Sequence, residues 1–304
     1  MNCSEKIGLE LVDKFVNREW EKIKNMKFPY PKISDDSCKK EWLTLKSKQL
    51  SIKNPSNIIR KFHKSIHKAS RIKHLSNYEY WNLLKEDFEL FRKFYFNRLT
   101  RSDWFKSPNN SKYLKEGYVP DFIYYCGLTT SGKAPLPSYF KPMLAKYIIT
   151  KYLKKYETIF DPFSGYSGRM LGTLACGKKY IGQDINEVTV KESKNILDFV
   201  NSNLTTFDSN VSCKLRVKDT LKSSGSYESL FTCSPYGLLE TWNQPIKDYT
   251  CDEWISLCLK NFKCEKYVFV TDDKIKKYKN NVVEELANTS HWGKNKEYIV
   301  IIKL

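Results

Sequence analysis

The stretch that decides the fold is residues 158–168, which read Thr158-Ile159-Phe160-Asp161-Pro162-Phe163-Ser164-Gly165-Tyr166-Ser167-Gly168. A short apolar strand is followed by two glycines, which let a backbone turn sharply and approach a ligand closely. The three-glycine dinucleotide spacing is absent and no G-K-[ST] triplet follows, so neither a dinucleotide fingerprint nor a P-loop is present. Ligands of open α/β sheets bind where strands end, and we therefore place a ligand crevice after Phe160.

Strands and helices alternate on both sides of this turn, from about Phe140 onward. The pattern predicts helices over 143–156, 169–176, 188–199, 254–262 and 281–287. It predicts strands over 158–160, 180–184, 214–217, 229–232, 267–271 and 298–303. Such alternation is typical of an α/β domain with a mainly parallel sheet covered by helices on both faces.

The N-terminal region differs in charge and in pattern. The chain has a formal charge of +18, and residues 1–120 contain 26 basic and 14 acidic side chains. Apolar residues at helical spacing predict helices over 7–23, 55–74 and 81–95, the last with an aromatic stripe that we assign to a core. We therefore divide the chain into a basic, mainly helical region over 1–130 and an α/β domain over 131–304.

No acidic residue occurs from Leu43 to Tyr78. A basic stretch of this kind suits a polyanion, and nucleic acid is the default candidate. Positions three and four apart share a helix face. On that spacing we predict phosphate contacts from Arg60, Lys61, Lys64, Lys68 and Arg71. The alternative is a structural helical cap whose lysines reflect overall composition.

Two acids follow later strands. Asp184 ends the expected strand 180–184, where a carboxylate can accept hydrogen bonds from both ribose hydroxyls of a nucleoside. The alternative is a helix N-cap, and the nearby glycine turn favours the ribose interpretation. Asp219 follows the third strand and either contacts an adenine amino group or serves as a turn residue.

A rigid loop follows the fourth strand, in Thr232-Cys233-Ser234-Pro235-Tyr236-Gly237. Pro235 fixes its own φ and restricts Ser234. We expect the ring of Tyr236 to lie over the crevice, where it can stack on a planar heterocycle.

These motifs together resemble the S-adenosylmethionine-dependent DNA amino-methyltransferases, which methylate N6 of adenine or N4 of cytosine. The likeness covers residues 135 to 304. Cys233-Ser234-Pro235-Tyr236 is similar to the family's catalytic tetrad, and the glycine turn is similar to its cofactor motif. The resemblance implies a Rossmann-like, seven-stranded sheet that binds S-adenosylmethionine. It implies cofactor contacts from Phe140, Lys141, Pro142, Asp161, Pro162, Phe163, Ser164, Gly165, Gly168, Asp184, Ile185 and Asp219.

The tetrad departs from the family pattern. Cys233 stands where an acid, amide or hydroxyl is usual, and a thiol is a poorer hydrogen-bond acceptor. Ser234 stands where proline is usual, although Ser234 could instead be aligned as the first residue with one proline missing. The target base is therefore left open. Methylation at C5 of cytosine by a cysteine thiolate would imply a Pro-Cys dipeptide. The order in this chain is Cys233-Ser234-Pro235, which does not match it.

The spacing of the motifs also bears on recognition. Only about 65 residues separate the cofactor motif from the tetrad, and two strand–helix steps fill them. A target-recognition insert does not fit there, so recognition is expected from the basic N-terminal region, together with the loop 238–252. Three functions stay open: methylation of DNA, the same chemistry on RNA, and a non-catalytic nucleic-acid-binding module.

Composition excludes several other classes. Mean hydropathy is −0.55, and no run approaches the roughly 20 apolar residues of a spanning helix. Nine cysteines without a C-x-x-C pair indicate neither a disulfide scaffold nor a zinc ribbon, and no metal site is predicted. No signal-peptide core is seen, so we expect a cytoplasmic protein of a bacterium, phage or virus, or a nuclear one in a eukaryote.

Overall fold

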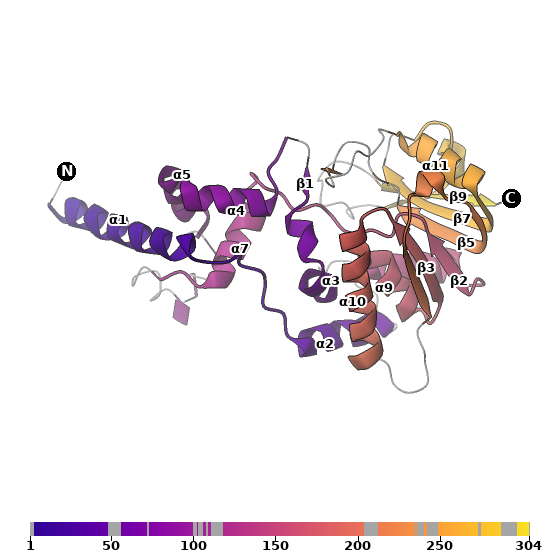
Figure 1. Cartoon of the computed structure of the whole chain (residues 1–304), viewed down its shortest axis with the longest axis horizontal. Helices are drawn as coiled ribbons and strands as arrows, with labels where there is room; N and C mark the ends of the chain where they lie inside the picture. Colours follow the sequence, from indigo (N-terminus) through magenta and orange to yellow (C-terminus); the bar gives the residue numbers. More distant parts are fainter. Residues whose placement is uncertain are drawn as a thin grey trace. The chain divides into compact units, whose positions relative to one another are not determined.

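The computed structural model describes residues 3–47, 56–71, 73–99, 102, 106–107, 109–110, 118–203, 212–233, 235, 240–241, 249–272, 275–286 and 297–303. The chain forms two compact units. We call residues 1–32 with 66–137 the helical unit, and residues 33–65 with 138–304 the sheet unit (Figure 1).

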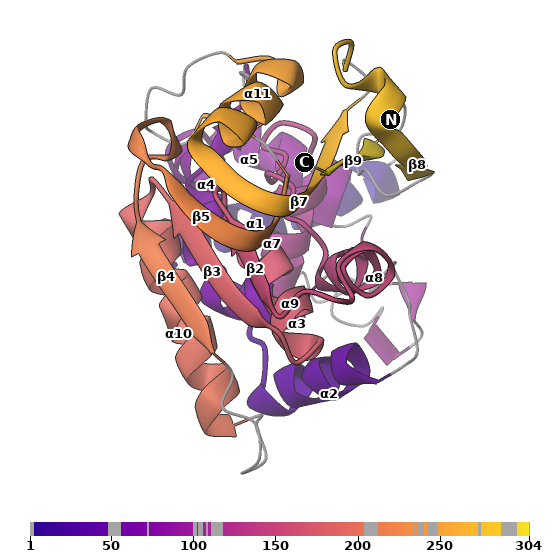
Figure 2. The ribbon, with the colours of Figure 1, turned by 90° about the vertical axis from the view of Figure 1, so that its right-hand side faces the viewer.

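The sheet unit contains a seven-stranded sheet (Figure 2). Its strands lie in the order β4 (Cys213–Val217), β3 (Lys179–Asp184), β2 (Thr158–Asp161), β5 (Gly225–Cys233), β7 (Phe262–Asp272), β9 (Glu297–Lys303) and β8 (Val282–Leu286). The first five strands pair in parallel, and β9 runs antiparallel to both of its neighbours. The predicted Rossmann-like α/β fold with seven mainly parallel strands is confirmed.

Helices cover both faces of this sheet. Successive residues of a strand point to opposite faces. Ile159 accordingly packs in a core with α8 (Pro142–Tyr152), while Phe160 packs in a second core with α11 (Cys251–Asn261). α9 (Gly168–Ala175) packs against α8, and α10 (Glu187–Asn203) packs on β3 and β4.

The predicted helix over residues 281–287 is wrong. Residues 281–287 were expected to be helical, but β8 occupies Val282–Leu286 after a short 3-10 turn, η6 (Lys279–Asn281). Apolar residues at 282 and 286 suit either a helix or a strand, and periodicity alone does not separate the two for so short a run. The β-branched pair Val282-Val283 favours a strand, and pairing with β9 decides it.

The segment 33–65 belongs to the sheet unit, which differs from the expected boundary near residue 130. It contains α2 (Asp35–Lys46) and α3 (Asn57–Phe62), which pack on α8, α9 and α10. The buried ammonium of Lys146 on α8 donates to the carbonyls of Leu45 and Lys46 at the end of α2. Glu41 of α2 accepts the backbone N–H of Ile58 at the start of α3. We call residues 33–65 the arm.

The predicted helix over 55–74 is much shorter in the structure. It ends at Phe62, and a 3-10 turn, η1 (Lys64–His67), and the two-residue strand β1 (Ser70–Arg71) follow. His63 and His67 are both buried instead of lying on a solvated helix face. The basic residues at 60, 64, 68 and 71 therefore do not share one helix face.

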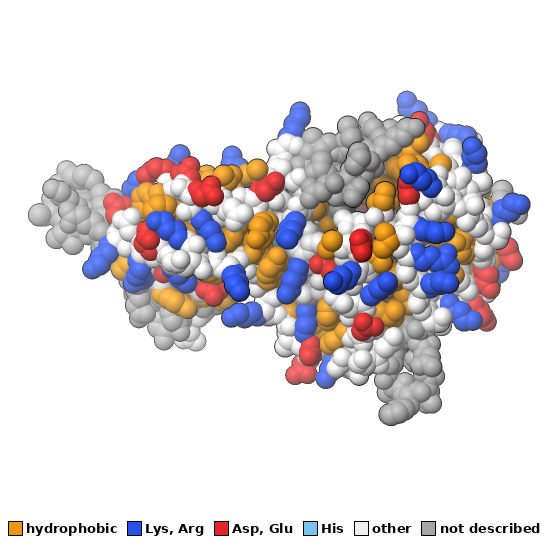
Figure 3. Space-filling model, viewed as in Figure 1, with side chains coloured by type: hydrophobic (Ala, Val, Ile, Leu, Met, Phe, Trp, Pro, Cys, Tyr) orange, Lys and Arg blue, Asp and Glu red, His pale blue; other side chains and the backbone are white. Residues whose placement is uncertain are grey.

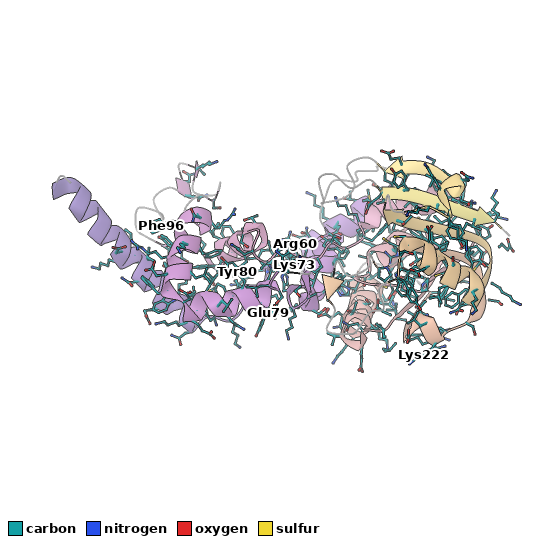
Figure 4. All side chains as sticks on the ribbon, turned by 90° about the horizontal axis from the view of Figure 1, so that it is seen from above. Arg60, Lys73, Glu79, Tyr80, Phe96 and Lys222 are labelled. Carbon is teal, nitrogen blue, oxygen red and sulfur yellow. The ribbon has the colours of Figure 1, made fainter. Side chains whose placement is uncertain are left out.

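The helical unit is built from α1 (Cys3–Lys24), α4 (Asn77–Glu86), α5 (Phe88–Phe94), the π-helical turn η2 (Tyr95–Leu99) and α7 (Asp121–Thr130). Trp81, Leu84, Phe91 and Tyr124 are buried in one core, which confirms that the aromatic stripe packs inside. Glu79 and Tyr80 of α4 and Phe96 of η2 are labelled in Figure 4. Within the described ranges, no helix is long and apolar enough to cross a membrane.

Candidate functional site

The turn between β2 and α9 lies where the strand order reverses, because β3 flanks β2 on one side and β5 on the other. Open α/β sheets bind ligands at this switch point. Gly165 has a φ of +50° and Ser167 a φ of +65°, both in the left-handed region. The N–H of Gly165 donates to Asp184 Oδ2 at 2.9 Å, so the turn is attached to the end of β3.

Asp161 lies beneath this turn and does not line the crevice as predicted. Its carboxylate is fully buried and forms an ion pair with Arg169, with Nε–Oδ2 at 2.7 Å. The hydroxyls of Tyr180 and Thr232 each donate to it at 2.7 Å, and the N–H of Phe163 donates at 3.2 Å. A carboxylate with this many internal donors is compensated for its burial, so Asp161 holds the turn between β3, β5 and α9.

Gly168 allows a close backbone approach at the start of α9. A β-carbon at this position would lie 1.6 Å from the carbonyl oxygen of Phe140. Phe140 in turn stacks under the guanidinium of Arg169, which lies 5.2 Å from the ring centroid, while Pro142 begins α8. The structure thus brings the predicted 140–142 element and the glycine turn together.

Asp184 is partly buried at the end of β3, and its carboxylate accepts the N–H groups of Gly165 and Asn186, each at 2.9 Å. Burial raises the pKa of this carboxyl, although the two N–H donors oppose the shift. Two aliphatic neighbours of Asp184 are unusually exposed for their type: Ile185, the next residue, at 46%, and Val217, its partner on β4, at 50%. Val188 on α10 and Leu221 on η4 are also exposed. A carboxylate bordered by exposed apolar side chains can bind a flat, partly apolar ligand with hydroxyl groups.

Asp219 lies beside this surface as the N-cap of η4 (Thr220–Lys222), and its carboxylate accepts the N–H of Leu221 at 2.9 Å. The structure thus shows the turn role, and the contact of Asp219 with an adenine amino group stays a prediction. The hydroxyl of Thr220 donates to the carbonyl of Pro162 at 2.5 Å and accepts from Gln183 at 3.0 Å. These bonds place η4 against the glycine turn. Ser164 Oγ, in the same turn, is buried and has no hydrogen-bond partner among the described residues.

The tetrad is described only in part. Cys233 ends β5 half-buried, directly after Thr232, whose hydroxyl reaches Asp161. Pro235 is half-exposed, whereas Ser234 and Tyr236 lie outside the described residues. The predicted recognition loop 238–252 also lies largely outside them. Because the hydroxyl of Thr232 donates to Asp161, the end of β5 is adjacent to the end of β2 and to the glycine turn. This is expected for parallel strands, whose carboxyl ends meet at one edge of the sheet.

The predicted phosphate-binding residues are divided between the two units, and their contacts with phosphate stay a prediction. Lys61 pairs with Asp35 and extends over the ring of Phe199 at 5.5 Å. Arg60, which is labelled in Figure 4, and Lys64 belong to the sheet unit, whereas Lys68 belongs to the helical unit. The side chain of Arg71 lies outside what the structure describes.

A different basic row, which sequence reasoning missed, lies on the edge strand β4 and the turn after it. Lys214 and Lys218 are exposed, Arg216 is half-exposed, and none of the three forms an ion pair with a described residue. Lys222 extends the row on η4 at the border of the sheet unit (Figure 4). Figure 3 shows Lys and Arg side chains gathered over the region that Figure 1 labels β3. Strand periodicity places Lys214 and Arg216 on one side of β4, and that spacing could have revealed these two members of the row.

Metal-ligand clusters are not found among the described residues. The contacts of Arg169 with Asp161 and of His63 with Ser167 were also absent from the sequence interpretation. Asp161 and Arg169 are eight residues apart across a strand, a turn and a helix, and such a spacing gives no periodic signal. His63 and Ser167 are 104 positions apart, so no local pattern connects them.

No protein-family model matches this chain, and no curated protein matches its sequence. Similar solved structures include magnesium protoporphyrin IX methyltransferase from Synechocystis PCC 6803, at 10% identity and a TM-score of 0.40, covering 66% of this chain and 94% of that one. Another is yhhF from Escherichia coli, provisionally described as a methyltransferase, at 10% identity and a TM-score of 0.39, covering 56% and 91%. A third is TrmN from Thermus thermophilus, at 14% identity and a TM-score of 0.37, covering 54% and 49%.

Proposed function

We propose that this protein transfers a methyl group from S-adenosylmethionine to an exocyclic amino group of a DNA base, adenine N6 or cytosine N4. The observation that carries the proposal is the surface around Asp184. A carboxylate with spare lone pairs lies among exposed Ile185, Val217 and Leu221, beside a left-handed glycine turn at the switch point of the sheet. This combination suits an adenosine, whose ribose offers hydroxyls and whose base offers an apolar face.

The residues present fit such a cofactor. The carboxylate of Asp184 accepts one backbone donor on each oxygen and retains acceptor capacity for ribose hydroxyls. The buried hydroxyl of Ser164 has no partner among the described residues and is available to a bound polar group. When bound, S-adenosylmethionine supplies a methyl group already activated as a sulfonium. Phe163 and Gly165, the partly exposed residues of the turn, would border it.

The end of β5 would position the acceptor base. Acceptors at Cys233 and Ser234, including backbone carbonyls, would bind the hydrogens of the exocyclic amino group and favour a tetrahedral nitrogen. The ring of Tyr236 would stack on the base, which in duplex DNA must first be flipped out at a cost of a few kcal/mol. These residues contribute mainly by orienting the amino nitrogen, so their effect should be on the rate more than on cofactor affinity.

Charge supports a polyanionic substrate. The chain carries +18, and the row formed by Lys214, Arg216, Lys218 and Lys222 presents several cations on one edge of the sheet unit. Phosphate contacts from such a row would give affinity that falls steeply with salt. An alternative role for lysines on an edge strand is to prevent edge-to-edge association.

The test is mass spectrometry of nucleosides after incubation of the full chain with deuteromethyl-labelled donor and either DNA or RNA. Labelled N6-methyladenine or N4-methylcytosine in DNA is expected. Label found only in RNA would mean that the protein transfers the methyl group as proposed, but to RNA instead of DNA. Cofactor binding without label in either polymer would indicate a non-catalytic binding module, which the unusual Cys-Ser-Pro-Tyr sequence makes a concrete alternative.

A further inference from the structure

A buried chain of hydrogen bonds connects the arm to the glycine turn. His63 Nε2 lies 2.8 Å from Ser167 Oγ, and His63 Nδ1 lies 3.2 Å from Glu192 Oε2 on α10. Ser167 Oγ donates to Ser193 Oγ at 2.7 Å, and Ser193 donates in turn to the carbonyl of Thr189. Because the hydroxyl hydrogen of Ser167 is directed at Ser193, Ser167 Oγ accepts a hydrogen bond from the imidazole.

The other side of His63 is also fixed. Glu192 accepts the N–H of Ser65 at 3.0 Å as well as the hydroxyl of Ser65. Burial acts to raise the pKa of Glu192, but the hydrogen bonds from His63 and Ser65 outweigh it and lower the pKa. The ring of His63 is fully buried and meets the ring of Tyr166 edge-on at 5.2 Å. The imidazole of His63, a residue of the arm, thus connects α10 with the glycine turn.

Ser167 is the residue of the turn that most needs support. A left-handed backbone is costly for a residue with a β-carbon and persists where surrounding contacts impose it. At Ser167 those contacts are the bonds to His63 and Ser193, since its side chain caps no N–H of α9. The next residue is Gly168, from which α9 begins.

We infer that His63 is a positioning residue for the cofactor: it holds Ser167, and hence the turn 163–168, in the conformation that binds the methyl donor. The inference rests on the proposed function for the identity of that donor. It assigns the arm a role in the cofactor site, although the arm lies about 100 residues before the turn in sequence.

Two variants separate positioning from mere core packing. The amide nitrogen of Gln reaches approximately the position of Nε2, whereas that of Asn reaches approximately the position of Nδ1. His63→Gln therefore keeps the bond to Ser167, and His63→Asn keeps only the bond to Glu192. His67 supplies the matched control, because it is an equally buried histidine, in the helical unit, whose Nδ1 lies 3.2 Å from Asn77 Oδ1.

The experiment measures donor affinity by calorimetry, KM and kcat, together with amide hydrogen exchange of residues 163–168 in the full-length variants. We expect His63→Asn to weaken donor binding and raise its KM about tenfold, the scale of one lost hydrogen bond in a buried site, with kcat nearly unchanged. Exchange in the turn should accelerate. His63→Gln should restore most of both properties, and His67→Gln should change neither.

Equal donor affinity and equal exchange in His63→Asn and His63→Gln would overturn the inference, because the bond to Ser167 would then have no effect on the turn. If the wild-type protein binds no S-adenosylmethionine, the proposed function fails instead. The exchange comparison still decides whether His63 orders the turn, since it needs no ligand. If His63→Asn fails to fold, Ser167→Ala replaces it; this change also removes the bond to Ser193, so Ser193→Ala, which keeps the bond to His63, is its control.

Discussion

Asp184 connects the geometry of the turn to the proposed chemistry, because its carboxylate holds Gly165 and its strand partner Val217 is an exposed apolar residue. Asp184→Ala should weaken S-adenosylmethionine binding by about 1.5–3 kcal/mol, the scale of a lost hydrogen bond to a charged group. Calorimetry measures this directly. Asp198→Ala, an exposed acid on α10, makes the same charge change as a control and should leave affinity unchanged. Equal affinity in both variants would remove Asp184 from the cofactor site.

The protonation of Asp184 should also be visible in the pH dependence of binding. Burial raises its pKa above the ordinary value of 3.8, so it gains a proton at a higher pH than an exposed aspartate. Donor affinity should fall as the pH falls through this raised pKa, since the protonated carboxyl loses acceptor capacity. A titration of affinity against pH checks this, and Asp184→Asn should lack the transition. A wild-type profile identical to that of Asp184→Asn would contradict the assignment.

Stability should respond to the same group in the opposite direction. Because the folded-state pKa lies above the unfolded one, the contribution of Asp184 to stability is present at low pH and is lost as the pH rises through the folded pKa. The ionised form that favours cofactor binding is therefore the less favourable one for the unliganded fold.

At Cys233 the question is whether the side chain acts as an acceptor or as a nucleophile. Cys233→Ser should keep methyl transfer, since a hydroxyl is the better hydrogen-bond acceptor. Tyr236→Ala should lose most of the transfer while its affinity for the donor stays nearly intact. Rates and donor affinity measured on the same preparations check both statements. A folded but inactive Cys233→Ser would instead favour a covalent thiolate route.

The contact between α9 and Phe140, which precedes α8, depends on one glycine. Gly168→Ala should lower the free energy of unfolding by at least about 2 kcal/mol, because its β-carbon would overlap the carbonyl of Phe140 and force the backbone apart. Gly177→Ala is the comparison: it has a φ of +69° but no atom within 4 Å, so it should cost only the roughly 1–2 kcal/mol of a left-handed alanine. Denaturant unfolding of both variants measures the difference, and equal losses would contradict this account.

How far the sequence predicted these elements depends on whether the signal was local. The turn 161–168 and the alternation of strands and helices are local patterns, and the sheet follows them. β8 was mistaken for a helix because two apolar residues four apart fit both periods. The position of the arm, and with it the role of His63, depends on contacts between residues far apart in sequence, for which no periodicity exists.

The excess of positive charge over the full chain should appear as a salt dependence of nucleic-acid binding. Each phosphate contact adds about 0.9 to the slope of log affinity against log salt on duplex DNA. Replacing Lys214, Arg216 and Lys218 by Gln should lower that slope by about 2–3 and weaken all sequences alike. A second variant replaces Arg60, Lys64 and Lys68 by Gln and so makes the same charge change. It tests the phosphate contacts predicted for the acid-free stretch from Leu43 to Tyr78.

An unchanged slope in the first variant would assign the β4 lysines to protection of the sheet edge. A lowered slope only in the second would place the phosphate contacts on the acid-free stretch after all. Both measurements need the full chain. The first variant changes only the sheet unit, whereas the second changes Arg60 and Lys64 in the sheet unit and Lys68 in the helical unit.

Methyl transfer itself is tested by incubating the full chain with deuteromethyl-labelled S-adenosylmethionine and nucleic acid, followed by mass spectrometry of the nucleosides. We expect label on an exocyclic nitrogen of adenine or cytosine in DNA. Asp184→Ala should lose this label when the donor is limiting, and Tyr236→Ala should lose it at all donor concentrations. A wild-type protein that is folded and saturated with donor, yet leaves DNA and RNA unlabelled, would contradict the proposed methyl transfer.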